Sequence, residues 1–345
     1  MGKKFDVVIG NPPYQEEATG SGTRDTPVYH LFMDAAYEVA HKAVLITPAR
    51  FLFNAGFTPR AWNEKMLADP SLSVAIYEAN SGELFPGTDI KGGIAVTYRN
   101  AAKRGEPIGT FTKYSELNEI LQKVQEFGMV PLEHIGITSS RSYRYTDSLY
   151  DDHPEARALR PEGNTALVNT NTFEQFDFLF HKERPKDGFE YVQVFGLIKN
   201  RRMARWIRRA YITGPESFAT FKTAIAAANG SGGLGEVLST PYVLDPDMAV
   251  TQTFITIGRF DDRREADACL KYVKTKFART LLGVLKITQH NPGKVWKYVP
   301  LQDFTRKSDI DWSKSIPEID QQLYAKYGLD TDEIEFIETH VKPMS

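Results

Sequence analysis

The sequence predicts an α/β fold for about the first hundred residues and a mixed α+β region for the rest. Short apolar runs rich in β-branched residues alternate with helical stretches, and glycine or proline closes several of these runs. After residue 102 the pattern changes to aromatic-rich strands separated by long loops. These observations predict a largely parallel sheet in residues 1–102 and a second domain in residues 103–345.

The elements of the first domain follow from local patterns. Phe5–Gly10 is an apolar run that stops at glycine and Asn-Pro-Pro, which predicts a buried strand ending in a rigid turn. A polar loop is expected over 15–26, and apolar residues three and four apart predict an amphipathic helix over 29–40. Three further strands are predicted at 43–47, 73–78 and 93–98. Loops at the carboxyl ends of such strands commonly form binding sites.

The second domain is expected to contain both strands and helices. Aromatic-rich strands are predicted at 191–195 and 251–258, a helical stretch at 221–228, and a strand-like run at 237–243. Longer helical patterns cover 265–285, 316–327 and 333–340.

Composition limits the classes of function. The 345 residues contain 42 Lys and Arg against 44 Asp and Glu, so any nucleic-acid binding must use a local basic surface. The single cysteine, Cys269, excludes an internal disulfide, and the scattered histidines show no metal-ligand spacing. No apolar run has membrane-spanning length and no signal peptide is recognisable, so we expect a cytoplasmic, soluble protein without a metal site.

The motif that carries chemistry is Asn11-Pro12-Pro13-Tyr14. Two prolines fix their own φ angles and keep the flanking residues extended. The motif therefore presents one amide side chain, one proline carbonyl and one aromatic ring in a rigid arrangement. An exocyclic amine has two hydrogens, and the Asn11 side-chain oxygen and the Pro12 carbonyl can accept both. The Tyr14 ring offers a face for base stacking, which is worth about 1–3 kcal/mol in comparable contacts.

The run from Phe5 to Gln15, which contains Asn11–Tyr14, resembles the catalytic motif of DNA methyltransferases that modify the amino group of adenine. It is most similar to the methylase part of type II restriction–modification enzymes with the gamma-like motif order. The segments 42–52 and 91–99 resemble the family's following strands, and parts of 195–209 and 287–300 resemble its target-recognition regions.

The resemblance implies a partial Rossmann-like methyltransferase sheet followed by a target-recognition domain that binds double-stranded DNA. It implies methyl transfer from S-adenosylmethionine to the N6 amine of an adenine turned out of the duplex. Asn11, Pro12, Pro13 and Tyr14 would form the catalytic motif, and Tyr98 would supply a second aromatic wall for the base. The resemblance leaves two candidate partner proteins, a second polypeptide that supplies the cofactor-binding half or a nuclease.

One departure from the family concerns its cofactor site. The family's glycine-rich turn precedes the Asn-Pro-Pro-Tyr motif, whereas only ten residues precede Asn11 here. The downstream loop Gly230–Gly235 is interpreted as a flexible helix-to-strand connection, because a nucleotide loop needs a strand before it and a helix after it. The cofactor half would then come from a second polypeptide, have been lost from a truncated gene, or lie upstream of this sequence.

Two basic segments are candidates for DNA contact. In 199–209 six of eleven residues are basic, and a helix there would place a cationic stripe on one side. Its candidates are Lys199, Arg201, Arg202, Arg205, Arg208 and Arg209. The segment 141–145 interleaves Arg141 and Arg144 with Ser142, Tyr143 and Tyr145, which suits stacking beside phosphate contacts.

Two alternatives to an active methyltransferase remain open. The chain could be a non-catalytic DNA specificity subunit for a partner that holds the cofactor half, or a degenerate remnant that keeps only the fold. Calorimetric binding of S-adenosylmethionine to the isolated chain separates the enzyme from the specificity subunit.

Overall fold

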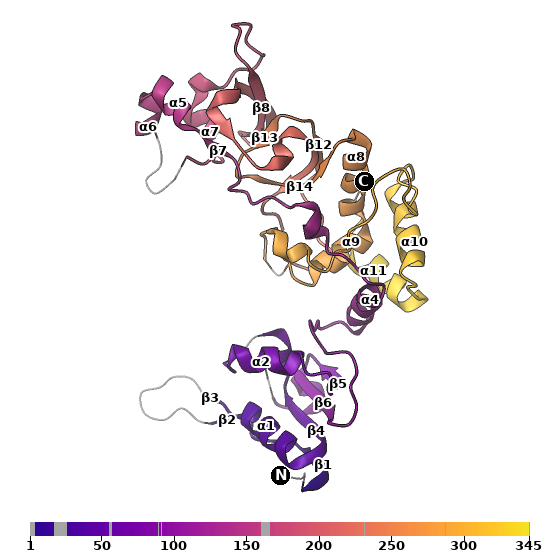
Figure 1. Cartoon of the computed structure of the whole chain (residues 1–345). Helices are drawn as coiled ribbons and strands as arrows, with labels where there is room; N and C mark the ends of the chain where they lie inside the picture. Colours follow the sequence, from indigo (N-terminus) through magenta and orange to yellow (C-terminus); the bar gives the residue numbers. More distant parts are fainter. Residues whose placement is uncertain are drawn as a thin grey trace. The chain divides into compact units, whose positions relative to one another are not determined.

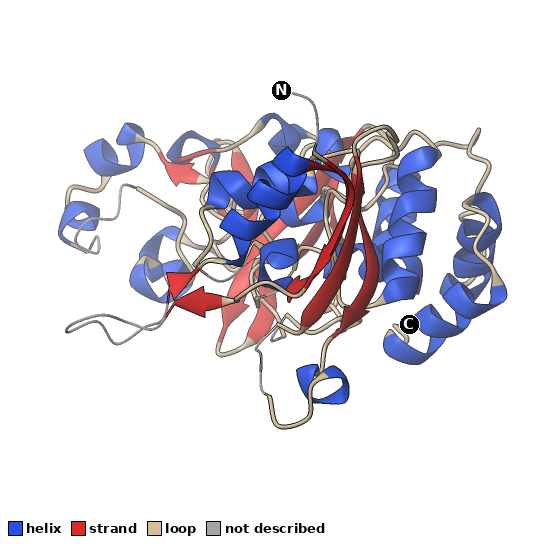
Figure 2. Cartoon of the chain, turned by 90° about the horizontal axis from the view of Figure 1, so that it is seen from below, coloured by secondary structure: helices blue, strands red, loops and turns tan. Residues whose placement is uncertain are grey.

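The computed structural model describes residues 4–16, 26–54, 57–88, 90, 92–159, 166–230, 232–286 and 288–344. The chain is divided into two compact units, Met1–Asn118 and Glu119–Ser345. Each unit contains helices and strands (Figures 1 and 2), so the chain is a mixed α/β protein with several small sheets. In the described ranges, no helix combines the length and apolar character needed to cross a membrane.

Unit 1 is built on a four-stranded sheet with the order β1-β4-β6-β5 (Figure 1). The strands are β1 (Phe5–Gly10), β4 (Ala40–Pro48), β5 (Leu72–Glu78) and β6 (Ile94–Asn100). The helices are α1 (Tyr29–Val39), α2 (Arg60–Leu67) and the short α3 (Ser81–Leu84). The four predicted strands and the predicted helix are therefore confirmed.

The direction of the strands differs in part from the prediction of a largely parallel sheet. β1 and β4 are parallel, but β6 lies between β4 and β5 and pairs antiparallel with both. Three strands point one way and one is reversed, so only one of the sheet's three pairings is parallel. Local sequence could not give this result, because a strand's apolar pattern is the same in either direction.

The two faces of this sheet differ in how well they are covered. Ala43 and Leu45 of β4 lie on one face with Val8 of β1, where they pack in the core of unit 1 with α1 residues such as Met33. Side chains alternate along a strand, so Val7 and Ile9 lie on the opposite face. Phe5, Val7, Ile9 and Ile76 are all exposed, and Ile9 reaches 75%.

Two short strands connect β1 to α1. β2 (Gln15–Glu16) pairs antiparallel with β3 (Thr26–Pro27), and Val28 N–H donates to the Tyr14 carbonyl at 3.1 Å. The predicted loop 15–26 is thus paired at both ends, and its residues 17–25 lie outside the described residues.

The segment after the predicted boundary at residue 102 packs with unit 1. Gly105 N–H donates to the Pro70 carbonyl at 2.7 Å, and the Phe111 ring lies against Phe53 and Tyr77. The helix α4 (Ser115–Glu126) then crosses the division between the units. The assignment of a catalytic and a target-recognition region on either side stays a prediction.

Unit 2 contains two three-stranded sheets and one two-stranded sheet among its described residues. One has the order β13-β8-β9, formed by Met248–Val250, Tyr191–Ile198 and Arg201–Arg208. The second has the order β12-β11-β14, formed by Tyr242–Leu244, Phe221–Ala226 and Phe254–Phe260. β7 (Arg144–Tyr145) pairs with β10 (Ile212–Thr213). The short helices α5, α6 and α7 span Asp147–Asp152, Glu155–Ala158 and Thr172–Gln175.

Two predictions for unit 2 are wrong. Most of the basic segment 199–209, predicted as a helix, forms β9 of a hairpin with β8, in which Ile198 pairs with Arg201 across a two-residue turn. Lys199 and Asn200 both have positive φ, the conformation that suits such a tight turn. The stretch 221–228, also predicted as helical, begins with β11, a buried central strand paired on both sides. Cross-strand packing decided both outcomes over helical propensity.

The carboxyl-terminal helices confirm the predicted helical patterns. α8 (Arg263–Lys274) and α9 (Lys276–Gly283) replace the single predicted stretch, and α10 (Ile316–Lys326) and α11 (Thr331–His340) follow. Asp320 of α10 is 2% exposed and accepts hydrogen bonds from the first backbone N–H groups of α9, those of Lys276 and Phe277. It thereby satisfies two donors that the helix itself cannot. Burial raises the pKa of the Asp320 carboxyl to about 6, although these two bonds partly offset it.

We predict that Asp320 makes the stability of the chain depend on pH between about 4 and 6. Its pKa is higher in the folded than in the unfolded chain, so its contribution is most favourable below pH 4 and is lost as pH rises through 6. The Asp320→Asn variant does not titrate. The unfolding free energy of wild type minus that of the variant should fall by on the order of 2 kcal/mol from pH 4 to 7. Urea unfolding of both proteins across this range measures the difference, and a constant difference would contradict the assignment.

Candidate functional site

Asn11–Tyr14 lies directly after β1, at the edge of the sheet where β1 and its parallel neighbour β4 both end. Gly10 pairs with Leu45, and three residues later β4 ends at Pro48. Because β6 runs the opposite way, its first residue, Ile94, lies opposite Pro48. The loops that follow β1 and β4 and the segment that precedes β6 therefore meet at one edge of the sheet.

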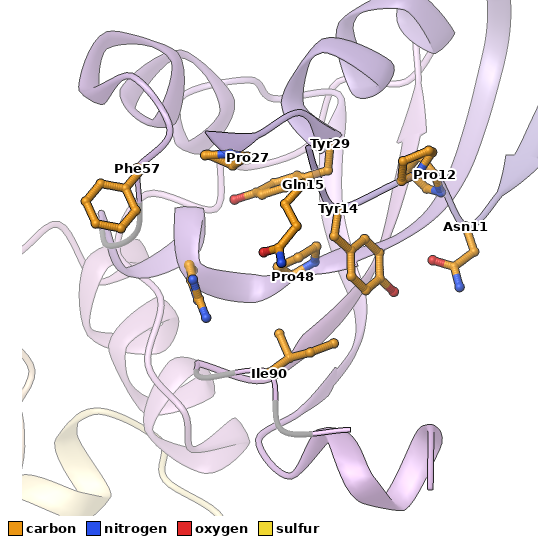
Figure 3. A pocket seen from close by; sticks show the side chains of 11 residues that line it. Asn11, Pro12, Tyr14, Gln15, Pro27, Tyr29, Pro48, Phe57 and Ile90 are labelled. Carbon is orange, nitrogen blue, oxygen red and sulfur yellow. The ribbon is translucent and has the colours of Figure 1, made fainter. Parts of the chain in front are cut away.

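These loops enclose a pocket of about 710 Å³, a volume typical of small-molecule sites. The wall includes all four residues of the motif. Figure 3 shows Asn11 at one end of the pocket and Phe57 at the other, with Tyr14, Gln15 and Ile90 between them. The lining residues are Asn11, Pro12, Pro13, Tyr14, Gln15, Pro27, Tyr29, Pro48, Arg50, Phe57 and Ile90.

The motif presents its polar groups to this pocket. Asn11 is exposed, Pro12 is half-buried, and in the described parts of the chain no backbone N–H donates to the Pro12 carbonyl. The Tyr14 hydroxyl makes no hydrogen bond of standard geometry with a described residue. Burial raises the pKa of Tyr14, and the nearby Asn11 side chain partly offsets this effect, so the phenol stays neutral near pH 7. The end of the pocket at Asn11 thus offers two acceptors and an aromatic ring.

The structure adds pocket residues that the sequence analysis did not identify, among them Tyr29, Arg50, Phe57 and Ile90. Arg50 follows Pro48 at the carboxyl end of β4, as Asn11 follows the end of β1. The rule that points to loops after parallel strands could therefore have indicated Arg50. Phe57 and Ile90 lie in loops with no local signal, and only the folded chain brings them to the pocket.

Tyr98, the predicted second aromatic wall, is not among the residues that line the pocket. It lies in the middle of β6, where it pairs with Val44 of β4 and Ser73 of β5, four residues from the strand end at the pocket. The structure does not bring Tyr98 and Tyr14 together at this pocket.

The segment predicted to be a helix with a cationic stripe is mostly the strand β9, along which side chains alternate between two faces. Several of its arginines contact other residues of unit 2. Arg202 donates to the Thr240 carbonyl at 2.7 Å and stacks over the Tyr242 ring. Arg208 lies over the Phe189 ring at 3.6 Å and near the carboxylates of Asp152 and Asp187.

Two more arginines of this segment also bond within unit 2. Arg209 donates to the Ile212 carbonyl at 2.8 Å, and Arg205 donates to the Ala204 carbonyl at 2.9 Å. Lys199 and Arg201, by contrast, are exposed at the turn of the hairpin, and no hydrogen bond or ion pair joins their side chains to a described residue.

The second basic segment, 141–145, does not present its rings for stacking. Tyr143 and Tyr145 are 3% and 4% exposed and belong to the hydrophobic core of unit 2. Arg141 and Arg144 are exposed beside them. The expectation of base-stacking rings in this segment is therefore wrong, while its arginines stay accessible.

The glycine-rich loop Gly230–Gly235 connects two strands, β11 and β12, and not the helix and strand that the sequence predicted. The Glu236 carboxylate fills its interior: it accepts from Gly232 N–H at 3.0 Å and lies 3.6 Å from the ammonium group of the buried Lys286. A Cβ atom on Gly230 would collide with this carboxylate. The Glu236 carboxylate thus occupies the space where an anion would bind. The next element is the strand β12 and not a helix, whose N-terminus could bind an anion.

Neither a metal cluster nor a reactive thiol is found among the described residues. They contain no cluster of three or more His, Cys, Asp or Glu side chains that could hold a metal ion. Cys269 is fully buried, and burial raises the pKa of its thiol to about 12. Such a thiol is protonated and unreactive near pH 7.

Comparison with known proteins supports a relation for the first part of the chain. Residues 1–85 match the family model described as Eco57I restriction-modification methylase, so the first quarter of the chain is similar to these methylases. The match includes Asn11–Tyr14 and ends before β6. No curated protein sequence matches the chain.

Among solved structures, the chain is similar to the type IIG restriction endonuclease BpuSI. The two are 11% identical, with a TM-score of 0.33, over 97% of this chain and 53% of BpuSI. The chain thus spans about half the length of that enzyme, and a TM-score this low does not establish a shared fold.

Proposed function

We propose that this chain acts in adenine-N6 methylation of DNA within a restriction–modification system. The observation that carries the proposal is the position of Asn11–Tyr14: the motif follows a parallel strand and lines a pocket at the carboxyl edge of the sheet. The match of residues 1–85 to restriction–modification methylases supports it.

The proposed chemistry uses the acceptors at the Asn11 end of the pocket. An adenine turned out of the duplex would stack on Tyr14, at an unstacking cost of a few kcal/mol. The Asn11 side-chain oxygen and the Pro12 carbonyl would accept the two amine hydrogens. Both bonds draw the nitrogen lone pair away from the ring and make it more nucleophilic. The rate would then come from orientation and electrostatics, without a covalent enzyme intermediate.

The second wall of this base site would come from the apolar residues that line the pocket with Tyr14, and not from Tyr98. Ile90, Tyr29 and Phe57 are candidates for this wall, because all three line the pocket. They arise from three different segments, so the base site would depend on the folding of the whole of unit 1.

We infer that the methyl donor is S-adenosylmethionine, which supplies an electrophilic methyl group when bound. The described residues of this pocket and of the glycine-rich loop do not fit this donor. Its ribose hydroxyls and ammonium group call for an acidic side chain, and the described residues that line the pocket include none, while the loop Gly230–Gly235 is filled by Glu236. We therefore derive no step that involves the donor.

The first prediction for this function concerns the amine acceptor. Asn11→Ala should lower methyl transfer at least about 100-fold while DNA affinity stays nearly unchanged, because only the reacting amine loses a partner. Tyr14→Phe, which keeps the ring and removes only the hydroxyl near the Asn11 side chain, should retain activity. The readout is N6-methyladenine in genomic DNA of a methylation-free host that expresses the complete system. An active Asn11→Ala protein would refute the catalytic role of the motif.

We also propose that unit 2 contacts double-stranded DNA through the turn of the β8–β9 hairpin. The major groove admits a two-stranded β-ribbon, and the accessible cations of this hairpin are Lys199 and Arg201. Arg202, Arg208 and Arg209 would instead stabilise unit 2 through their internal contacts.

The double variant Lys199→Ala/Arg201→Ala should weaken DNA binding and reduce the salt dependence. The slope of log K against log salt should fall by about 0.9 for each lost phosphate contact. Arg208→Ala is the matched control, because it should lower the melting temperature without changing the slope. Fluorescence anisotropy at several salt concentrations measures the slopes, and thermal unfolding measures the melting temperature. An unchanged slope in the double variant would remove the hairpin turn from the DNA surface.

A partner polypeptide is the third part of the proposal. β1 pairs only with β4 among the described strands, so its other edge has unpaired backbone groups beside the exposed Val7 and Ile9. Open apolar edges pair with added strands. We propose that a second polypeptide covers this edge and contributes to the cofactor half of the site.

The isolated chain should therefore self-associate and be inactive. Ile9→Lys, which puts a charge on the open edge strand, should shift the chain toward monomer in sedimentation velocity experiments. Leu31→Lys is the matched control: Leu31 is an exposed apolar residue on α1 and not on the edge strand, and the variant should associate like wild type. A monodisperse wild-type monomer that methylates DNA unaided would contradict the need for a partner.

A further inference from the structure

Among the described residues that line the pocket of unit 1, one side chain carries a formal charge, and that side chain is Arg50. The remaining lining residues are amides, tyrosines, prolines and apolar side chains. Arg50 is half-buried. A cation among apolar walls is screened less than one in open water, so it favours an anionic ligand.

The backbone around Arg50 is held firmly. Arg50 lies in a 3₁₀ turn, Ala49–Phe53, in which Ala49 and Phe51 are fully buried. Ala49 N–H donates to the Gly93 carbonyl at 2.9 Å, which ties the turn to the segment before β6.

Gly92 packs against the aliphatic part of the Arg50 side chain. Gly92 has a φ of +89°, and a Cβ atom at this position would lie 3.0 Å from the Arg50 Cγ. The Gly92 backbone therefore packs closely on the aliphatic stem of Arg50. A cation with a fixed backbone and a packed stem loses little further entropy when it binds a ligand.

We infer that Arg50 binds the phosphate of the nucleotide whose base stacks on Tyr14. This inference rests on the proposed function, because a base that leaves the duplex takes its own sugar and phosphate to the pocket. The guanidinium fork matches the geometry of a phosphate, with which it forms charge-assisted hydrogen bonds. The pocket would thus have an amine-binding end at Asn11 and a phosphate-binding position at Arg50.

The test uses the full chain and two probes that differ only by a phosphate, deoxyadenosine and deoxyadenosine 5′-monophosphate. We expect the monophosphate to bind wild type about 10-fold more tightly than deoxyadenosine does. This factor corresponds to the lower end of the free energies found for hydrogen bonds to a charged group. Arg50→Met, which keeps the stem against Gly92 and removes the charge, should bind the two probes equally. Arg50→Lys should retain part of the preference. Ligand-observed NMR titration measures such weak affinities.

Two controls separate this inference from the proposed function. Arg60→Met removes a charge from the same unit at an exposed residue that does not line the pocket, and should leave the preference unchanged. Asn11→Ala should weaken both probes by the same factor, because it acts on the base and not on the phosphate.

Equal binding of both probes to wild type, with Asn11→Ala weakening both, would overturn the role of Arg50 and leave the base pocket standing. If neither probe binds wild type, both the base pocket and the phosphate site are wrong. A further pair of probes tests whether Arg50 binds a carboxylate instead of a phosphate. S-adenosylhomocysteine carries a carboxylate, which methylthioadenosine lacks. If Arg50→Met removes only the preference for the first of these, the anion is a carboxylate and the inference is overturned.

Discussion

The candidate site depends on the parallel pairing of β1 with β4. This pairing aligns Gly10 with Leu45, so the chain leaves both strands at the same edge of the sheet. Prolines then prevent further pairing, since Pro12, Pro13 and Pro48 cannot donate a ladder hydrogen bond. Without the pairing, Asn11 and Arg50, 39 residues apart in sequence, would have no reason to line one pocket.

The helix α1 makes this pairing possible, because parallel neighbours need a crossover connection. It buries residues such as Met33 against the Ala43 and Leu45 face of β4. The other face of β1 has no equivalent cover, and Ile9 there is the most exposed of the large apolar side chains described. The strand that places the motif is thus also the strand with an open edge, which links our proposal for the site to our proposal for a partner.

Unit 2 shows how folding context changes the meaning of a basic sequence. Arginines that would form a stripe on a helix alternate between two faces on β9, where Arg202 and Arg208 each lie over an aromatic ring. Arg209 follows the strand and donates to a backbone carbonyl. An arginine with such contacts loses packing as well as charge when it is replaced. The number of basic residues in a segment therefore says little about how many can reach a phosphate.

The sequence by itself determined the four strands and the first helix of unit 1, and it predicted a chemistry for the motif. Apolar runs, two of them closed by glycine or proline, predicted the four strands, and Asn-Pro-Pro-Tyr predicted two acceptors and a ring, because these features depend only on neighbouring residues. The helices α8 to α11 were also predicted, since their apolar periodicity is long and regular.

Tertiary structure decided what depends on distant partners: the reversed direction of β6, the strands β9 and β11 in place of helices, and the burial of Tyr143 and Tyr145. It also decided which residues join Asn11 at the pocket, because Tyr29, Arg50, Phe57 and Ile90 are brought there only when the sheet and its loops are assembled.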